Sequence, residues 1–177
     1  PRVPPFATIH PHLPVFHLNG ISKMFALPDL KLGWIAANPA GYGPWSDRLE
    51  LLNDTFLGAN SLTQHMLPTL FGQGMPFVEQ MVERVRANMQ FALERFQGSE
   101  RIAAQLPDGG YYLFPQIDTA EEEEHCVLTL LDRGINVHPG YFYGYERGVH
   151  LMVSALTEAT VFREGVERLV RGIEELA

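Results

Sequence analysis

The sequence predicts an α/β fold that continues through one long helix into a smaller α+β unit, and three patterns support this prediction. Short apolar runs in the first 40 residues end at turn residues, which is typical of buried strands. A single apolar stripe then continues at helical spacing over residues 76–96. Beyond Gly98, short strand-like runs alternate with amphipathic segments, as in a layer of strands backed by helices. With 177 residues, 46% of them hydrophobic, the chain is long enough to bury a core.

The charge and the cysteine content argue against several classes of protein. A formal net charge of -8 disfavours a broad surface for nucleic acid or for anionic membranes, although a local pocket can still hold a small anion. No apolar run is long enough to span a membrane. The single cysteine, Cys126, can form neither an internal disulfide nor a thiolate zinc cluster, which suits a reducing cytoplasm. Because the chain begins Pro-Arg-Val-Pro-Pro, without an initiator methionine, we expect it to be a fragment of a longer protein.

The first 74 residues are expected to contain an extended connection, two strands and two helices. Residues 1–14 include five prolines, which block helix formation and predict an extended surface segment. The apolar runs 15–18 and 32–37 end at Asn-Gly and Asn-Pro, so both fit buried strands bounded by turns. Apolar residues recur at helical spacing over residues 44–56 and again, in a shorter helix, over residues 62–70.

The residues after Gly98 are expected to form the smaller unit. Runs 102–106 and 110–114 fit strands around the turn 107–109, and two more short strands are expected at 135–138 and 150–154. Residues 121–133 fit a helix, and Thr157 is a plausible N-cap for a closing helix. The expected inner faces of these two helices are apolar: Val127, Leu128, Leu130 and Leu131 in the first, and Val161, Phe162, Val166, Leu169, Val170, Ile173 and Leu176 in the second.

The segment around Lys23 carries the strongest chemical signal. A lysine is nucleophilic only when its amine is neutral, which requires desolvation or a neighbouring positive charge. Apolar residues between Ile21 and Leu27 are expected to enclose Lys23, which could then form a Schiff base, while Lys31 would provide a fixed positive charge for a phosphate. Gly20 would let the backbone approach a ligand closely. The same pattern is also compatible with a turn lysine that points to water.

Four short motifs follow one another along the chain: 20–23 (Gly-Ile-Ser-Lys) with Lys31 eight positions later, 61–64 (Ser-Leu-Thr-Gln), 109–115 (Gly-Gly-Tyr-Tyr-Leu-Phe-Pro) and 137–140 (Val-His-Pro-Gly). In this order they resemble the cofactor-lysine signature, the serine/threonine–glutamine turn, the GGFY-F strand and the V-PG turn of the class I/II, fold type I pyridoxal-phosphate-dependent aminotransferases. The matches span nearly the whole chain. The resemblance therefore implies the carboxyl-terminal portion of such an enzyme.

This resemblance implies a domain organisation and a set of roles. Residues 1–74 would be the incomplete C-terminal part of the large cofactor-binding domain, residues 75–98 a connecting helix, and residues 99–177 the small C-terminal α+β domain. The cofactor would be pyridoxal 5'-phosphate, bound by Lys23, Lys31, Ser22 and Gly20, with Lys23 as the catalytic residue. The intact protein would be a cytoplasmic homodimer that transfers an amino group between a small-molecule amino donor and an oxo acid. The isolated chain would be inactive, because most of the cofactor pocket lies upstream.

The sequence also departs from the family pattern. Gly20 stands where many members have a phosphate-binding serine, Lys31 stands where most have arginine, and Asp29 replaces glycine or asparagine. Met152 occupies the position at which the family commonly has the arginine that grips the substrate carboxylate, and methionine cannot make that contact. Residues expected near the substrate are accordingly Tyr111, Tyr112, Met152 and Arg147, with His138 and His150 also close in sequence.

Several alternatives stay open at this point. The departure at Met152 is compatible with lyase, decarboxylase or synthase chemistry. The missing front could carry a DNA-binding head, which would make the protein a regulator, or the chain could be a non-catalytic interaction domain. The acidic run 121–124 is interpreted as a solvated helix start, and His10, His12 and His17 only weakly suggest a metal site, so no metal is expected. The aromatic run 141–145 fits packing or a surface loop, but it could also line a substrate entrance.

Overall fold

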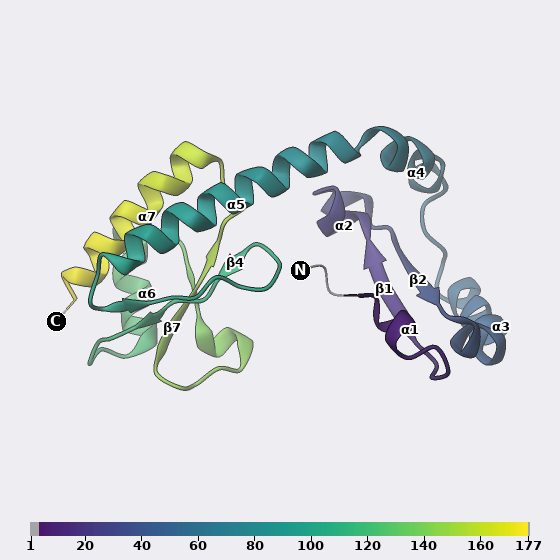
Figure 1. The fold of residues 1–177 in the computed structure, drawn as a ribbon, viewed down its shortest axis with the longest axis horizontal. Coiled ribbons are helices and arrows are strands. Elements are labelled where there is room, and N and C mark those ends of the chain that lie inside the picture. The colour runs from purple at the N-terminus through teal and green to yellow at the C-terminus, as the bar shows by residue number, and fades with distance from the viewer. Residues whose placement is uncertain (1–3, 177) are drawn as a thin grey trace. The chain divides into compact units, whose positions relative to one another are not determined.

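The computed structural model describes residues 4–176, which form two compact units that meet at Val78 and Glu79 (Figure 1). Each unit has its own cluster of buried apolar side chains. Helices and antiparallel strands occur in both units, which confirms the predicted mixture of helix and sheet. The expectations for residues 1–3 and 177 lie outside the described residues. Among residues 4–176, no helix combines the length and the apolar character that a bilayer crossing requires.

The first unit contains a two-stranded antiparallel ribbon and a series of helices. The ribbon consists of β1 (Phe16–Gly20) and β2 (Gly33–Ala37), and its register pairs Phe16 with Ala37 and Gly20 with Gly33. The helical elements are α1 (Phe6–Ile9), α2 (Ile21–Met24), the 3-10 helix η1 (Pro28–Leu30), α3 (Pro39–Thr55) and α4 (Ser61–Gln73).

Two expectations for the first unit are wrong. Residues 1–14 were expected to be extended, but α1 forms between the prolines, because Phe6–Ile9 is itself free of proline and can close one helical turn. The two strands were expected to be buried, but most of their side chains are exposed. A ribbon of only two strands leaves most side chains without a packing partner among the described residues.

The segment that connects β1 to β2 packs on a small apolar cluster. Its buried members are Ile21, Phe25 and Leu32, and α4 contributes Leu67 and Leu70 to its edge. The ring of Phe71 meets Phe25 and Trp34 edge-on, with centroid distances of 5.4 and 5.7 Å. This cluster fixes the backbone around both lysines of the predicted cofactor motif.

Asn38 sets the start of α3 five residues before the predicted position. Its Oδ1 atom accepts hydrogen bonds from the backbone N–H groups of Gly41 and Val15, both at 3.0 Å, and its Nδ2 atom donates to the carbonyl of Leu13 at 2.8 Å. Pro39 follows at the first helical position, where its missing N–H is not needed. This cap therefore outweighs Pro44, which lies inside the helix.

Helix α5 (Met75–Gln97) is the long helix that the sequence predicts. Its buried residues Val85, Met89, Ala92 and Phe96 belong to the predicted stripe region and face the core of the second unit. Gly98 ends the helix as predicted, and its N–H donates to the carbonyl of Arg95 at 3.2 Å. The boundary between the compact units lies within this helix, near its start.

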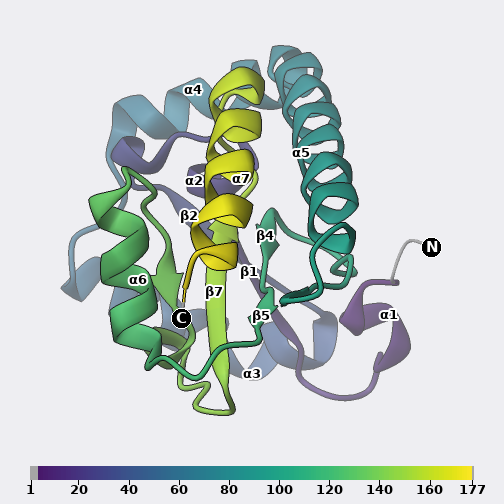
Figure 2. The same cartoon turned by 90° about the vertical axis from the view of Figure 1, so that its left-hand side faces the viewer.

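The second unit is built on an antiparallel sheet with the strand order β3-β5-β7-β4, in which β6 also pairs with β7. The strands are β3 (Ile102–Ala103), β4 (Tyr112–Leu113), β5 (Gln116–Ile117), β6 (His138–Pro139) and β7 (Val149–Ser154). The helices are α6 (Glu123–Asp132), α7 (Ala159–Glu174) and the 3-10 helix η2 (Gly140–Tyr143). Figure 2 shows α7 in front of β7, with α6 and α5 on either side.

The predicted hairpin around residues 107–109 does not form. Strand β3 pairs with β5, whereas β4 pairs with β7, so the two flanking runs are not neighbours in the sheet. Both β4 and β5 run along β7, with Tyr112 opposite Ser154 and Gln116 opposite His150. This arrangement buries Leu113 in the core, and that long-range packing outweighs the local turn signal.

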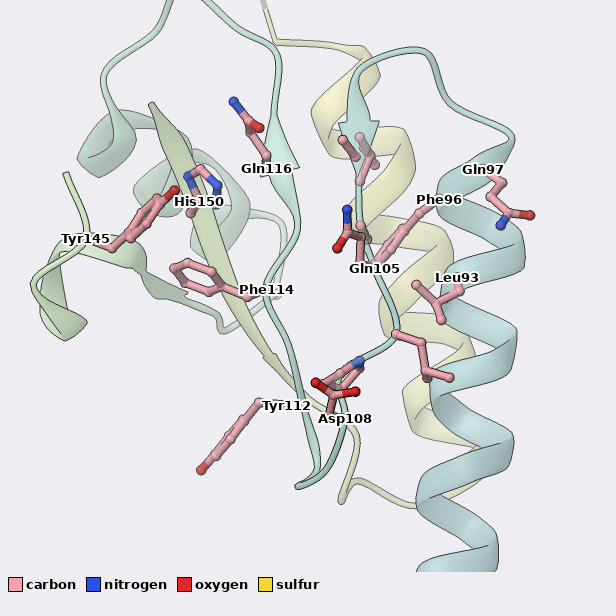
Figure 3. Close-up of a pocket in the computed structure, with 15 residues that line it drawn as sticks. Leu93, Phe96, Gln97, Gln105, Asp108, Tyr112, Phe114, Gln116, Tyr145 and His150 are labelled. Carbon is pink, nitrogen blue, oxygen red and sulfur yellow. The ribbon is translucent and has the colours of Figure 1, made fainter. Parts of the chain in front are cut away.

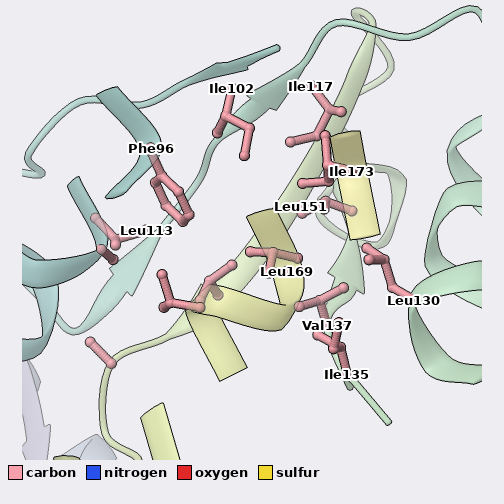
Figure 4. Close-up of a cluster of buried hydrophobic side chains, with 14 of the residues drawn as sticks. Phe96, Ile102, Leu113, Ile117, Leu130, Ile135, Val137, Leu151, Leu169 and Ile173 are labelled. Atoms are coloured by element: carbon pink, nitrogen blue, oxygen red, sulfur yellow. The ribbon is translucent and has the colours of Figure 1, made fainter. Parts of the chain in front are cut away.

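The core of the second unit gathers side chains from α5, α6, α7 and the sheet (Figure 4). Of the predicted inner faces, Leu130, Phe162, Val166, Leu169, Ile173 and Leu176 are buried, but Leu128, Leu131 and Val161 are exposed. Helix α6 turns Cys126 and Leu130, one helical turn apart, toward the core, which rotates Leu128 and Leu131 away from it. Cys126 is buried as predicted, and burial raises the pKa of its thiol, which keeps the sulfur in its less reactive form.

The closing helix α7 is capped by Glu158 and not by Thr157. The Glu158 carboxylate accepts hydrogen bonds from the backbone N–H groups of Thr160 and Val161 at 2.9 and 3.2 Å. Thr157 contributes its carbonyl oxygen elsewhere, to the side chain of Asn88 at 2.9 Å. A glutamate can reach the first free N–H groups of a helix, and its charge also matches the positive end of the helix dipole.

Candidate active site

Lys23 lies in α2, a single helical turn between two buried anchors. Ile21 and Phe25 flank it and are both buried in the small cluster of the first unit. The N–H of Ile21 donates to the carbonyl of Leu32 at 3.1 Å, and the N–H of Phe25 donates to the carbonyl of Ile21 at 3.0 Å. The backbone that carries Lys23 is therefore held on both sides, while the lysine side chain is exposed.

Lys31 is held in an unusual backbone conformation directly before buried Leu32. Its φ and ψ angles are 47° and 53°, in the left-handed region, and Ala26 on the other side of η1 also has a positive φ of 55°. Residues with a Cβ atom adopt such angles at a cost in energy, and conformations of this kind are concentrated at functional sites. Lys23 and Lys31 are the only lysines in the chain, and both are exposed next to residues of one buried cluster.

The expected enclosure of Lys23 is not formed by the residues that the structure describes. Ile21 and Phe25 point into the cluster below the loop, Met24 and Leu27 pack at its edge, and Ala26 is exposed. The apolar residues therefore support the backbone and do not surround the amine. The sequence pattern could not distinguish these two arrangements, because both place the same residue types beside the lysine.

Gly20 and Ser22 complete the predicted cofactor-binding group. A Cβ atom on Gly20 would lie 2.9 Å from the carbonyl oxygen of Leu32, so the close approach of the β2 end already requires glycine there. Ser22 is half-buried on α2. With Lys23 and Lys31, these residues present two amines and a hydroxyl around one anchored loop. This set of donors fits the aldehyde and the phosphate of pyridoxal phosphate.

The predicted substrate residues all belong to the second unit. Tyr111 packs against the core and its ring lies 4.5 Å from that of Tyr112, which is exposed. Met152 is half-buried on β7, opposite His138. Tyr112 and Met152 thus lie on adjacent strands, whereas Arg147 is exposed in the connection before β7 and forms no ion pair with any described residue.

Glu123 is a structural contact that the sequence interpretation missed. The acidic run 121–124 was expected to be a solvated helix start, but the Glu123 carboxylate is half-buried and accepts hydrogen bonds from the backbone N–H groups of Gly140 and His150. A Cβ atom on Gly140 would lie 2.9 Å from Oε1 of Glu123 and 3.0 Å from Cβ of His150, so glycine allows this close packing. Glu123 thereby joins α6 to the turn after β6 and to β7.

The second unit also contains an open cavity of about 740 Å³ (Figure 3). Phe114, Tyr145 and His150 form one wall, and residues of α5 and of the segment after β3 form the other. From the sequence, the aromatic run 141–145 is interpreted as packing, as a surface loop or as the lining of a substrate entrance, and no pattern connects that run to Phe114. Among residues 4–176, no three His, Cys, Asp or Glu side chains gather into a group that could hold a metal ion.

Comparisons with known proteins place the chain among aminotransferases. The sequence model of class I and II aminotransferases matches residues 3–169. The chain is similar to an uncharacterized HTH-type transcriptional regulator of Bacillus subtilis, at 26% identity over 99% of this chain and 37% of that protein. It is also similar to a glutamate-pyruvate aminotransferase of Haemophilus influenzae, at 24% identity over 96% and 44% of the two chains.

Solved structures show the same fold. An aminotransferase from Escherichia coli superposes with a TM-score of 0.81 at 21% identity, over 96% of this chain and 44% of that one. A PLP-dependent aminotransferase from Streptococcus suis superposes with a TM-score of 0.80 at 19% identity, over 92% and 42% of the two chains. The fold is therefore that of the fold type I aminotransferases, and the chain spans less than half the length of each of these relatives.

Proposed function

Because the chain belongs to the class I and II aminotransferases, we propose that the whole protein transfers an amino group between an amino donor and an oxo acid, with pyridoxal 5'-phosphate as its cofactor. The family match over residues 3–169 is the observation that carries this proposal. The placement of both lysines beside one buried cluster supports it, because an anchored loop can hold two cations at a fixed spacing.

Each member of the predicted cofactor group has a role that its chemistry allows. Lys23 carries the primary amine that would hold the cofactor and would later move a proton at the substrate carbon. Lys31 would bind the phosphate as a point charge, without the paired hydrogen bonds of an arginine. Ser22 would donate its hydroxyl. When bound, pyridoxal phosphate supplies an electron sink for the negative charge that develops at the substrate carbon.

We further propose the organisation that the family implies. Residues 1–74 belong to the large domain, residues 75–98 connect the domains, and residues 99–177 form the small domain. The whole protein is a homodimer, and its single cysteine in this region suits the cytoplasm. Tyr111, Tyr112, Met152 and Arg147 are the substrate candidates of the small domain. Position 152 is methionine and not arginine, so a substrate carboxylate is not bound by a side chain at this position.

A second function, transcriptional regulation, is favoured by one of the relatives. The regulator from Bacillus subtilis aligns with 99% of this chain over only 37% of its own length, so an aminotransferase-like part can accompany other functions in a longer protein. In that case a DNA-binding segment would lie outside this chain. The protein expressed from its complete reading frame distinguishes the two functions: transfer of an amino group to an oxo acid supports the enzyme, whereas specific DNA binding without transfer supports the regulator.

The assignment of Lys23 is tested by locating the lysine that holds the cofactor. The protein from the complete reading frame is incubated with pyridoxal phosphate, reduced with borohydride and digested, and the labelled peptide is sequenced. We expect the label on Lys23 and its loss in Lys23→Ala. Lys31→Arg is the matched control, because it preserves the charge and should retain the label. A label on any other residue would contradict the assignment, even if the protein proves to be an aminotransferase.

A further inference from the structure

The cavity in the second unit is lined by side chains that are distant in the sequence but adjacent in the sheet. Phe114 precedes β5, His150 lies on β7, and the register pairs Gln116 with His150. Tyr145 reaches the same wall from the connection after η2. Figure 3 shows Phe114, Tyr145 and His150 grouped together, with Gln116 near them.

His150 is a buried polar side chain that lines this cavity. It is only 7% exposed, and its ring stacks on Phe114 at a centroid distance of 5.0 Å and meets Tyr145 edge-on at 4.6 Å. Its Nδ1 atom lies 3.4 Å from the carbonyl oxygen of Gly148, which can only accept a hydrogen bond, so Nδ1 carries the proton. When the ring carries this one proton, Nε2 is left as a hydrogen-bond acceptor, and no described side chain donates to it.

The charge of the cavity lining limits the ligands that it can take. Asp108 is the only acidic residue among the lining residues, and none of them is lysine or arginine. The remaining polar groups are mainly the amides of Gln97, Gln105 and Gln116. A buried carboxylate or phosphate would find no cation here to offset its desolvation. An uncharged or cationic group would be accepted, because amide and carboxylate oxygens can receive its hydrogen bonds.

We propose that this cavity binds a small planar molecule that is uncharged or cationic and that donates a hydroxyl or N–H hydrogen bond to Nε2 of His150. The ring of the ligand stacks against the wall formed by Phe114 and Tyr145, which adds an attraction for aromatic rings and for cations. None of the predicted cofactor-binding residues (Lys23, Lys31, Ser22 and Gly20) lines this cavity, and the proposal does not depend on amino transfer.

Three related probes test the chemistry of the site. Tyramine has a planar ring, a hydroxyl donor and a positive charge; phenethylamine lacks the hydroxyl; and 3-(4-hydroxyphenyl)propanoate replaces the ammonium by a carboxylate. Binding is measured by calorimetry with the protein from the complete reading frame. The buffer is at about pH 8, which lies above the ordinary pKa of an imidazole. We expect saturable binding of tyramine, binding of phenethylamine weaker by about three- to tenfold, and no measurable binding of the propanoate.

Matched variants locate the binding and separate it from the cofactor site. His150→Phe keeps a ring against Phe114 but removes the acceptor, so tyramine should bind only as weakly as phenethylamine. Phe114→Leu should weaken both amines, whereas Phe142→Leu, at an exposed ring outside the lining, should weaken neither. Lys23→Ala should bind tyramine like the unchanged protein.

Four results would overturn the proposal. They are the absence of tyramine binding, equal binding of the propanoate, equal losses in the Phe114 and Phe142 variants, and loss of tyramine binding in Lys23→Ala. The last result would place the ligand at the cofactor site. Thermal unfolding of each variant is measured in parallel. If His150→Phe does not fold, the weaker amine binding expected for Phe114→Leu still tests the location of the site. Whether tyramine binds or not does not change which lysine carries the borohydride label, so the proposed function is judged separately.

Discussion

Asn88 joins helix α5 to the segment that follows β7 through a single buried amide. Its Nδ2 atom donates to the carbonyl of Ala155 at 3.0 Å and to that of Thr157 at 2.9 Å, and the residue is only 1% exposed. Both amide protons are therefore used. The side chain satisfies two carbonyl groups at the end of the central strand, where the chain turns toward α7.

Replacing Asn88 should destabilise the second unit strongly. In Asn88→Leu the two carbonyl groups lose their donor, and we expect the free energy of unfolding to fall by about 2–4 kcal/mol. Urea unfolding of the protein from its complete reading frame measures this change. Gln90→Leu, two residues away, is the control, because Gln90 is exposed and its side chain donates a hydrogen bond to Glu94 on its own helix. Equal stability of the two variants would contradict the structural role of Asn88.

Glu158 links the stability of α7 to pH. Hydrogen bonds from backbone N–H groups, that of Val161 first, lower the pKa of its carboxyl group. A lowered folded-state pKa means that the stabilisation is present above the ordinary pKa of glutamate and is lost as the pH falls through the folded-state value. We expect the stability difference between the unchanged protein and Glu158→Ala to shrink in acid. Urea unfolding at neutral and at acidic pH measures both stabilities. If the Glu158→Ala difference were constant over that pH range, the cap would not depend on the charge of Glu158.

At the scale of elements, helix α4 ends against the cluster that supports the cofactor motif. A Cβ atom on Gly74 would lie 2.5 Å from the carbonyl oxygen of Leu70 and 2.9 Å from Cε1 of Phe25. A Cβ atom on Gly72, within the same helix, would meet nothing within 4 Å. Two glycines separated by one residue thus have opposite packing environments.

These two glycines provide a paired prediction. Gly74→Ala should destabilise the first unit by about 1–3 kcal/mol, because either the helix end or Phe25 must move. Gly72→Ala should stabilise it by about 0.5–1 kcal/mol, because alanine favours the helix and fits the open space. Thermal unfolding of both variants measures the difference. A stabilised Gly74→Ala variant would show that the end of α4 does not pack on Phe25 as described.

Helices were easier to predict than strand partners for a physical reason. The stripe of α5 repeats within one contiguous segment, so its period is visible locally. The pairing partners of β3 and β4 lie 13 to 42 positions away in the sequence, and the turn at 107–109 contains no information about them. The faces of α6 were also misassigned, because its apolar residues cover more than the stripe that contacts the core.

At the scale of the whole molecule, the chain carries two lysines on an anchored loop but leaves both exposed. We therefore expect the isolated 177-residue chain to bind pyridoxal phosphate weakly and to transfer no amino groups. Absorbance titration and an amino-transfer assay measure this, with the protein from the complete reading frame as the reference. Stoichiometric binding by the isolated chain would show that it contains a sufficient pocket.

The sequence by itself determined the family, the long helix and the spacing of Lys23 and Lys31, because each of these depends on a short contiguous pattern. Only the tertiary structure decided that the apolar residues near Lys23 support its backbone, that Glu123 holds two distant N–H groups, and that Phe114 and His150 share one wall. These arrangements depend on strand register and on the direction of each side chain. Both are fixed by contacts between residues far apart in the chain, which no local pattern contains.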